Sequence, residues 1–392
     1  MVPTPGFART SPPRGEGVES FGLTHTLRIG LDAHMVGGHE TGNETYVRGL
    51  VDGFSELDGA CELYVYRTGS TWPAEVRNSR FRRLVGNSAW VRLAADLPIR
   101  TVRDGLDVLH TTYTAPLWSR CPTVVTVHDI SYAFHPEWFS PRDLRVLSNT
   151  VPWSIRRAAR VITVSQTCRD QIIERYGVRG EKVTCIPNAA GPAAMALDDE
   201  TARELISKRG LDPDRPYVLA VGNLQPRKNL ARLIAATGAL AAGGVDLDLV
   251  VAGPAHYRGD EVVAVARDAG QRVKFTGYLS DSELAAFYRR AAVFAFPSLF
   301  EGFGIPALEA MAHGVPVACS RAGALPEVCG MAAEYFDPYD VESITAALRR
   351  VLTDSGRRGE LIREGQARQR EFTWRRSAEL TLDVYREAAG SE

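Results

Sequence analysis

The chain has 392 residues, of which 45% are hydrophobic and 24% are charged, as in an ordinary globular protein. It holds 46 Lys and Arg and 47 Asp and Glu, so its net charge is -1, which excludes a dedicated nucleic-acid binder with its usual basic excess. No apolar run approaches the ~18 residues of a membrane-spanning helix, and the N-terminus lacks the apolar segment of a secretory signal. At about 150 residues per domain, this length favours two domains or more.

Six cysteines are scattered along the chain, with no CxxC pair and no Cys/His cluster at zinc spacing. Most of them lie in or beside apolar runs, which is typical of buried, reduced thiols, so we expect a cytoplasmic protein. The six are Cys61, Cys121, Cys168, Cys185, Cys319 and Cys329.

From residue 27 onward, short apolar runs alternate with helix-like stretches such as Glu44–Leu57 and Arg142–Ala158. This alternation predicts a parallel sheet that is covered on both faces. Residues 1–20 are rich in Pro, Gly, Arg and Ser without periodicity, so we expect a flexible tail there. The first series of predicted strands comprises 27–33, 61–66, 106–110, 122–128, 160–165 and 182–187.

A segment rich in Pro, Gly and small residues at 187–200 suits an interdomain linker, and a second series of strand-like runs follows it. We therefore predict an α/β fold with two doubly wound, Rossmann-like domains at 21–190 and 191–370, and a helical segment at 371–392. Ligands of such sheets bind at the C-terminal ends of the strands, so two facing domains would form a cleft. The second series comprises 217–222, 247–253, 273–277, 292–298, 315–320 and 333–336.

The segment Trp90–Arg103 has apolar residues at helical spacing and three arginines. It is the best local candidate for docking on an anionic membrane, but it holds few basic residues and Pro98 interrupts it. We expect a packed surface helix here.

The most informative stretch is FPSLFEGFGIPALEAMAHGVPV at 296–317, which predicts a strand, a turn and a helix from Ile305 to His313. Glu301 lies in the turn, where two glycines and the N–H groups of the helix N-terminus suit a phosphate. Glu309 falls at the edge of the helix's apolar arc, where a carboxylate is costly unless it is hydrogen-bonded. The alternative interpretation is a capping carboxylate at Glu301 and a structurally paired Glu309.

A second motif, GNLQPRKNL at 222–230, follows a predicted strand. The adjacent Arg227 and Lys228 can grip a diphosphate, Arg as a fork and Lys as a point charge. The stretch lacks GxxxxGK[ST] and is not a P-loop. The alternative is a solvated basic pair.

A third motif closes the strand at 122–128 with His128, which would face the cleft and could donate to sugar hydroxyls or to developing charge. The alternative is a structural histidine. A Gly-rich loop, Gly37–Tyr46, leads from the first strand into a helix and is a weak candidate for a phosphate or acceptor wall.

Taken in order, these motifs resemble family 4 of the retaining, nucleotide-sugar-dependent glycosyltransferases, the bacterial group 1 enzymes with the GT-B fold. Glu301 and Glu309 match the family's E-x7-E signature, and Arg227-Lys228 matches its diphosphate element. The resemblance covers about residues 27–387. One departure is Pro187-Asn188-Ala189-Ala190, where the family usually has Pro-Asn-Gly.

The resemblance implies roles for these residues. Arg227 and Lys228 would neutralise the leaving diphosphate in place of a metal ion, and Glu301 would hold the donor sugar. His128 would hydrogen-bond the sugar, Glu309 would bind the ribose, and the C-terminal helix would cross back onto the first domain. The implied catalytic residues are His128, Glu301, Arg227 and Lys228; the implied donor-binding residues are Gly42, Arg227, Lys228, Tyr278, Leu279, Glu301, Gly302, Phe303, Gly304 and Glu309.

The resemblance thus implies a hexosyltransferase that needs no cofactor and no metal. It would move a hexosyl, aminohexosyl or deoxyhexosyl group from a UDP- or GDP-sugar to a hydroxyl of a small-molecule, natural-product (aminoglycoside-like) or oligosaccharide acceptor. A lipid-linked or cell-envelope acceptor is the alternative within this class. Outside it stand a nucleotide-sugar epimerase and a non-catalytic nucleotide-sugar-binding protein.

Overall fold

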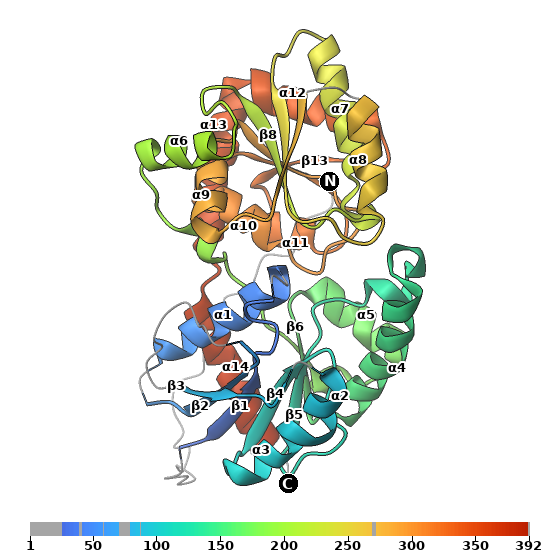
Figure 1. Cartoon of the computed structure of the whole chain (residues 1–392), viewed down its shortest axis with the longest axis vertical. Helices are drawn as coiled ribbons and strands as arrows, with labels where there is room; N and C mark the ends of the chain where they lie inside the picture. The colour runs from blue at the N-terminus through green and yellow to red at the C-terminus, as the bar shows by residue number, and fades with distance from the viewer. Residues whose placement is uncertain are drawn as a thin grey trace, which may run out of the picture.

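Two parallel β-sheets form the framework of the computed structural model, which describes residues 26–38, 41–57, 59–69, 79–86, 88–268 and 272–390 (Figure 1). Each sheet has helices packed on both faces, which confirms the predicted α/β class with two Rossmann-like domains. The predicted tail at 1–20 lies outside the described residues.

Seven parallel strands of the described chain form the first sheet, in the order β3-β2-β1-β4-β5-β6-β7. Six of them coincide with predicted runs, because their Val, Ile and Leu side chains are buried. The apolar pattern does not predict the seventh, β3, whose sequence SRFRR lies at the sheet edge, where charged residues protect the exposed backbone. The strands are β1 Arg28–Asp32, β2 Glu62–Arg67, β3 Ser79–Arg83, β4 Val108–Thr112, β5 Thr123–Thr126, β6 Arg160–Thr163 and β7 Val183–Cys185.

The helices of the first domain include one wide turn. Residues Arg92–Asp96 form a π-turn, η1, between two short α-helices. The extra residue of a π-turn shifts the helical phase, so Arg92 faces inward and is 8% exposed while Trp90 is 79% exposed. The regular stripe expected for Trp90–Arg103 is therefore only partly buried. The helices are α1 Thr41–Ser55, α2 Ala89–Val91, α3 Leu97–Arg103, α4 Pro141–Arg157 and α5 Gln166–Tyr176, with short 3-10 turns η2 Ser131–Ala133, η3 Pro136–Trp138 and η4 Gly180–Lys182.

The second sheet joins six parallel strands of the described residues in the order β10-β9-β8-β11-β12-β13, and all six were predicted. The strands are β8 Tyr217–Val221, β9 Asp248–Ala252, β10 Val273–Gly277, β11 Val293–Phe296, β12 Val317–Ser320 and β13 Ala333–Phe336. The helices are α6 Asp199–Lys208, α7 Leu230–Ala242, α8 Gly259–Asp268, α9 Asp281–Arg290, α10 Ile305–Ala312, α11 Leu325–Cys329, α12 Val341–Thr353 and α13 Ser355–Gln369, with 3-10 turns η5 Pro192–Ala194 and η6 Pro226–Lys228.

The last helix, α14 (Trp374–Ala389), packs against α1 of the first domain, where it is seen as the red helix of Figure 1. Two glycines of α1 make this approach possible. A Cβ atom on Gly49 would lie 2.1 Å from Cε2 of Trp374, and one on Gly53 would lie 2.2 Å from the Trp374 carbonyl oxygen. The Trp374 indole also donates to the carbonyl of Ala190 at 2.8 Å. The chain thus returns to its first domain after completing the second.

A buried polar chain ties α14 to the first sheet. Tyr385 Oη lies 2.6 Å from Nδ1 of His110, whose Nε2 lies 2.7 Å from Thr126 Oγ1, which in turn lies 2.9 Å from Tyr46 Oη. Burial lowers the pKa of His110 to about 3, so the ring is neutral and uses one nitrogen as donor and the other as acceptor.

Replacing Tyr385 by Phe is expected to lower the free energy of unfolding by about 1–3 kcal/mol, since it leaves one nitrogen of the buried His110 without a partner. Denaturant unfolding measures this loss. The matched control is Tyr339→Phe, because the Tyr339 side chain is 60% exposed. Equal stability of the two variants would contradict the role assigned to the chain.

Among the residues that the structure describes, no helix is both long enough and apolar enough to cross a membrane.

Candidate active site

The sequence-predicted residues gather where the C-terminal ends of the two sheets meet. His128 follows β5 of the first sheet, Arg227 and Lys228 follow β8 of the second, and Glu301 follows β11. The two domains touch here, because a Cβ atom on Gly302 would lie only 2.3 Å from the carbonyl oxygen of His128. The two halves of the candidate site therefore lie next to each other across the domain boundary.

The centre of the site is a buried cluster of two cations and one carboxylate. Arg227 Nη1 donates to Glu301 Oε2 at 2.9 Å and to the carbonyl of Phe300 at 2.9 Å, while Lys228 Nζ donates to Glu301 Oε1 at 2.7 Å. The side chains of Arg227, Lys228 and Glu301 are 18%, 11% and 9% exposed, so the interpretation of a solvated basic pair is wrong. The carboxylate of Asp129, from the first domain, also acts on both cations.

Charge coupling sets the protonation states of this cluster. Burial raises the pKa of Glu301, but the charges of Arg227 and Lys228 outweigh burial and lower this pKa to about 2. Burial lowers the pKa of Lys228, although Glu301 opposes that shift. Glu301 is therefore ionised at neutral pH and already engaged by both cations.

The Arg-Lys loop is held in place by a residue that the motif analysis did not single out. Asn229 adopts a left-handed conformation (φ 54°), and its side-chain amide donates to the carbonyls of Pro297 at 3.0 Å and Pro338 at 2.7 Å. Left-handed backbone is uncommon outside glycine but is enriched in Asn. The Asn after the Arg-Lys pair was the available sequence signal for this anchor.

The turn after β11 contradicts the alternative interpretation, in which Glu301 caps the following helix. Glu301 caps no helix: α10 begins at Ile305 without a side-chain cap, and Glu301 pairs with Arg227 and Lys228 instead. The Cα of Gly302 faces the first domain, while Phe303 is 5% exposed and packs in the hydrophobic core. Gly304 has φ 131°, a conformation that only glycine adopts easily.

Glu309 occupies a separate buried position on α10, where it is 5% exposed. Tyr288 Oη donates to its Oε2 at 2.9 Å, and its Oε1 lies against Gly191, where a Cβ atom would come within 2.4 Å. Burial raises the pKa of Glu309 to about 7. A hydroxyl ligand that donates to this carboxylate would favour its ionised form.

The ring of His128 has a nitrogen at the domain boundary that forms no hydrogen bond. Its Nε2 is buried and has no hydrogen-bond partner, and its ring packs edge-on against Tyr46 (4.7 Å between centroids) and Tyr113 (5.7 Å). Burial lowers the pKa of His128 to about 4, although Asp129 opposes the shift, so the ring is neutral. Tyr113 itself has φ 58°, a strained conformation of a kind that clusters at functional sites.

Buried side-chain atoms without a hydrogen-bond partner follow strands of both domains. Besides His128 Nε2, the buried side-chain atoms without a partner include Asn223 Oδ1 after β8 and Asn188 Oδ1 in the linker. Buried polar atoms without a partner are rare in proteins, and such a group calls for an explanation. A polar ligand at this boundary would supply the missing partners.

Three implied donor-site residues lie outside this cluster. Gly42 belongs to the first turn of α1, and a Cβ atom there would meet nothing within 4 Å. Tyr278 is 45% exposed after β10, whereas the side chain of Leu279 is 7% exposed and belongs to the core. Leu279 could therefore offer a ligand little besides its backbone.

Direct contacts clamp the domains on either side of the candidate site. Glu327 of α11 accepts hydrogen bonds from the backbone N–H groups of Gln166 (2.8 Å) and Thr167 (3.1 Å) at the start of α5. Arg48 of α1 pairs with Asp281 of α9 at 2.9 Å. These contacts hold the two rows of strand ends against each other.

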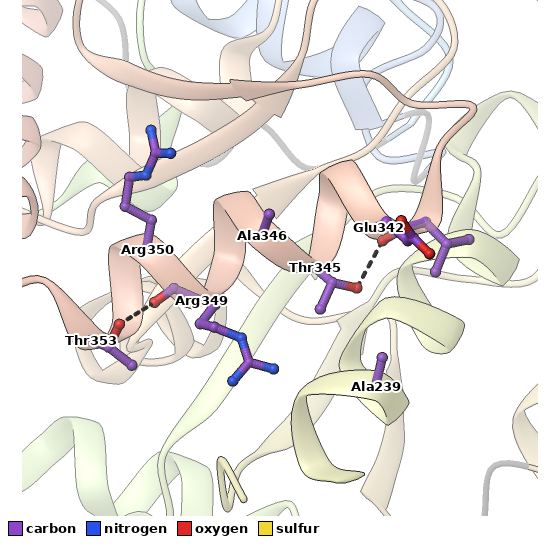
Figure 2. Close-up of a pocket in the computed structure, with 8 residues that line it drawn as sticks. Ala239, Glu342, Thr345, Ala346, Arg349, Arg350 and Thr353 are labelled. Carbon is purple, nitrogen blue, oxygen red and sulfur yellow. Dashed lines mark hydrogen bonds between the residues drawn. The ribbon is translucent and has the colours of Figure 1, made fainter. Parts of the chain in front are cut away.

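A pocket of about 430 Å³ lies elsewhere, between α7 and α12 (Figure 2). Arg350 on its wall pairs with Glu334 at 2.9 Å. It shares no residue with the candidate site and holds none of the sequence-predicted residues. Its lining comprises Ala239, Val341, Glu342, Thr345, Ala346, Arg349, Arg350 and Thr353.

Within the described ranges, no three His, Cys, Asp or Glu side chains are grouped so that they could hold a metal ion. That the reaction needs no metal stays a prediction.

Comparison with known proteins agrees with this arrangement. The family described as "Glycosyl transferases group 1" matches residues 201–368, and "Glycosyltransferase Family 4" matches residues 41–194. The O-antigen chain mannosyltransferase B of Escherichia coli is 31% identical over 269 residues, which cover 67% of this chain and 70% of that protein. The chain belongs to the group 1, family 4 glycosyltransferases.

Two further similarities have a smaller covered share of the other protein or a lower sequence identity. The serotype-specific mannosyltransferase WbdA of Escherichia coli is 31% identical over 272 residues, 67% of this chain but a third (33%) of that protein. A solved structure of Alr3699/HepE from Anabaena, in complex with UDP and glucose, has a TM-score of 0.71 at 20% identity over 91% of this chain and 99% of that one. This likeness confirms the GT-B fold.

Proposed function

We propose that this protein is a retaining hexosyltransferase that moves a sugar from a nucleotide diphosphate to a hydroxyl of an acceptor. The observation that carries the proposal is the buried cluster of Arg227, Lys228 and Glu301, which supplies two cations next to the domain boundary, where Gly302 meets the backbone of His128. Its place at the C-terminal ends of two facing sheets is where such folds bind nucleotides.

Arg227 and Lys228 supply the positive charge that the leaving group requires. Breaking the anomeric C–O bond leaves a sugar with oxocarbenium character and a nucleoside diphosphate that gains negative charge. Buried, preorganised cations stabilise such charge more strongly than cations in water. Glu301 fixes both side chains through its two oxygens, so the cations are oriented before the substrate arrives.

The state of Glu301 favours displacement on one face of the sugar. Both of its oxygens accept hydrogen bonds from cations, and its pKa is lowered to about 2 against the raising effect of burial, which makes it a weak nucleophile. We infer that the acceptor oxygen attacks from the side that the diphosphate leaves, and that the leaving phosphate takes the acceptor's proton. His128, neutral and unpartnered at Nε2, would hydrogen-bond the donor sugar.

Glu309 would bind the ribose. Its buried carboxylate receives one side-chain hydrogen bond, from Tyr288, and two ribose hydroxyls could satisfy the remaining oxygen lone pairs. The nucleotide would then lie between Glu309 and the Arg-Lys pair.

For the acceptor, we favour a saccharide hydroxyl, on a small molecule, a natural product or an oligosaccharide. The name of the relative that this chain covers to 70%, an O-antigen chain mannosyltransferase, favours a growing cell-envelope saccharide as the second candidate and a mannosyl donor among the hexoses. UDP and GDP both remain donor nucleotides to be tested.

Thermal melting in EDTA against UDP, GDP, ADP and dTDP tests the donor site. One nucleotide, at about 100 times its Kd, is expected to add about 2.7 kcal/mol to the native protein and raise its Tm. Glu309→Ala should lose this shift, whereas Glu204→Ala, on the exposed side of α6, should keep it. If no nucleotide shifts the native protein in EDTA or after adding Mg²⁺, the proposed donor class is wrong.

A further inference from the structure

A second histidine lies just after the C-terminal end of β1 in the first domain. The first sheet reverses its strand order between β1 and β4, which are neighbours in the order β3-β2-β1-β4-β5. Ligands of open parallel sheets bind outside the strand ends at such a reversal. β1 ends at Asp32, and His34 follows it after one residue, Ala33.

Asp32 holds the His34 side chain in one orientation. Asp32 is 1% exposed, and its Oδ1 lies 3.2 Å from the backbone N of His34 and 3.0 Å from its Nδ1. The carbonyl of His34 accepts a hydrogen bond from Thr68 at 2.9 Å. The His34 side chain remains 21% exposed, so its ring reaches the surface from a fixed base.

Arg92 completes the support from another element. Its Nε lies 3.3 Å from Asp32 Oδ2, an ion pair without a hydrogen bond, and Arg92 belongs to the π-turn η1. π-turns are rare and frequently mark functional sites. A buried ion pair is weak support for stability by itself, because desolvation offsets its attraction. We therefore assign this ion pair to holding Asp32, and through Asp32 the His34 ring, in one position.

The chemistry of the ring follows from this support. Burial raises the pKa of Asp32, but the interactions with His34 and Arg92 outweigh burial and lower this pKa. The carboxylate is therefore ionised and can accept the Nδ1–H of His34. The Nδ1 contact to Asp32 leaves Nε2 as the ring nitrogen of His34 that can meet a ligand, in a direction that the same contact fixes.

We propose that His34 is an acceptor-binding residue: its Nε2 forms a hydrogen bond with a hydroxyl of a polyhydroxylated acceptor, while Asp32 and Arg92 act as positioning residues. The inference rests on the proposed function and adds an acceptor-binding residue to the donor-binding cluster of the second domain. β4 separates β1 from β5, which His128 follows, so His34 and His128 stand two strands apart at the same edge of the sheet. Neighbouring strands are about 4.8 Å apart, so two strand spacings, roughly 10 Å, separate the ends of β1 and β5.

Saturation-transfer NMR with the native protein and its nucleotide tests the proposal. The probes are methyl α-D-mannopyranoside, maltose and myo-inositol, each of which carries adjacent ring hydroxyls. At least one probe should bind, and His34→Ala should weaken it about tenfold, the loss of roughly one hydrogen bond. His34→Gln, which keeps an amide donor for Asp32 and an acceptor oxygen for the probe, should restore part of the affinity.

The variants also separate the residue's role from fold stability and from the donor site. Asp32→Asn should weaken the same probe, whereas Asp104→Asn, which meets Tyr66 rather than a histidine, should not. The nucleotide-induced rise in Tm should be unchanged in His34→Ala. If the nucleotide binds but none of the probes does, or if His34→Ala binds the probe as the native protein does, the proposal is overturned; if the nucleotide itself fails to bind, the proposed function has failed instead.

Discussion

Replacing Lys228 by Ala is expected to lower turnover by about 10²–10³-fold, the usual cost of removing one preorganised donor from a developing anion. Lys228 Nζ lies 2.7 Å from Glu301 and is mostly buried, so water cannot take its place without rearrangement. Because Arg227 still pairs with Glu301, the carboxylate keeps one partner and the variant should remain folded. Release of the nucleotide from its sugar conjugate, measured at saturating donor, reports the loss.

Two comparisons make that result specific. Lys208→Ala removes an exposed lysine that pairs with Glu204 on the surface of α6, and turnover should not change. Lys228→Arg keeps the charge in a larger, planar group and should recover only part of the activity. Native turnover in a folded Lys228→Ala protein would show that this lysine does not stabilise the leaving group.

Replacing Gly302 by Ala is expected to abolish most of the activity without preventing nucleotide binding. The added methyl group would lie 2.3 Å from the carbonyl oxygen of His128 and 3.0 Å from Cβ of Asp129, and one of these contacts is with backbone that cannot rotate away. The domains must therefore separate at the point where Glu301 and His128 face each other. A displacement of about 1 Å in an active site costs on the order of 10²-fold in rate.

The measurement pairs turnover with the nucleotide-induced rise in Tm for Gly302→Ala. The rise should persist, since Arg227, Lys228 and Glu309 all belong to the second domain. Gly238→Ala is the matched control, because a Cβ atom in the middle of α7 meets nothing within 4 Å. Normal turnover of Gly302→Ala would mean that the domains do not need this close contact during the reaction.

The sequence predicts most strands of the two sheets, because a buried strand has a recognisable local pattern of apolar residues. Buried parallel strands are continuous apolar runs, and all of the described strands but one coincide with such a run. The exception, β3, pairs by its backbone at the sheet edge, where its arginines contact solvent and the rings of neighbouring residues. Nothing in the alternation of apolar residues marks a strand of that kind.

In the candidate site, too, some residues stand in local motifs and others are brought together only by packing. Arg227, Lys228, Glu301 and Glu309 stand in short motifs, so the sequence singles them out and the resemblance of these motifs to the family's implies their roles. By contrast, Asp32 meets Arg92 only through a π-turn, whose phase shift follows from packing rather than from periodicity.

Contacts between distant segments were equally hidden. The close approach of Gly302 to His128 depends on how two domains meet, and no local pattern encodes it. The hydrogen bond between Tyr385 and His110 joins residues 275 positions apart, and no local pattern pairs them. Both become visible only when the fold is assembled.

The return of α14 separates the order in which this protein is made from the order in which it can fold. The strands of the first sheet and α1 are translated early, yet the face of α1 around Gly49 and Gly53 is covered only once Trp374–Ala389 has been made. Nascent domains generally fold as units, the N-terminal one first. Here the first domain reaches its final packing only after the second has left the ribosome, so a chain stalled in the second domain presents an unfinished first domain to chaperones and proteases.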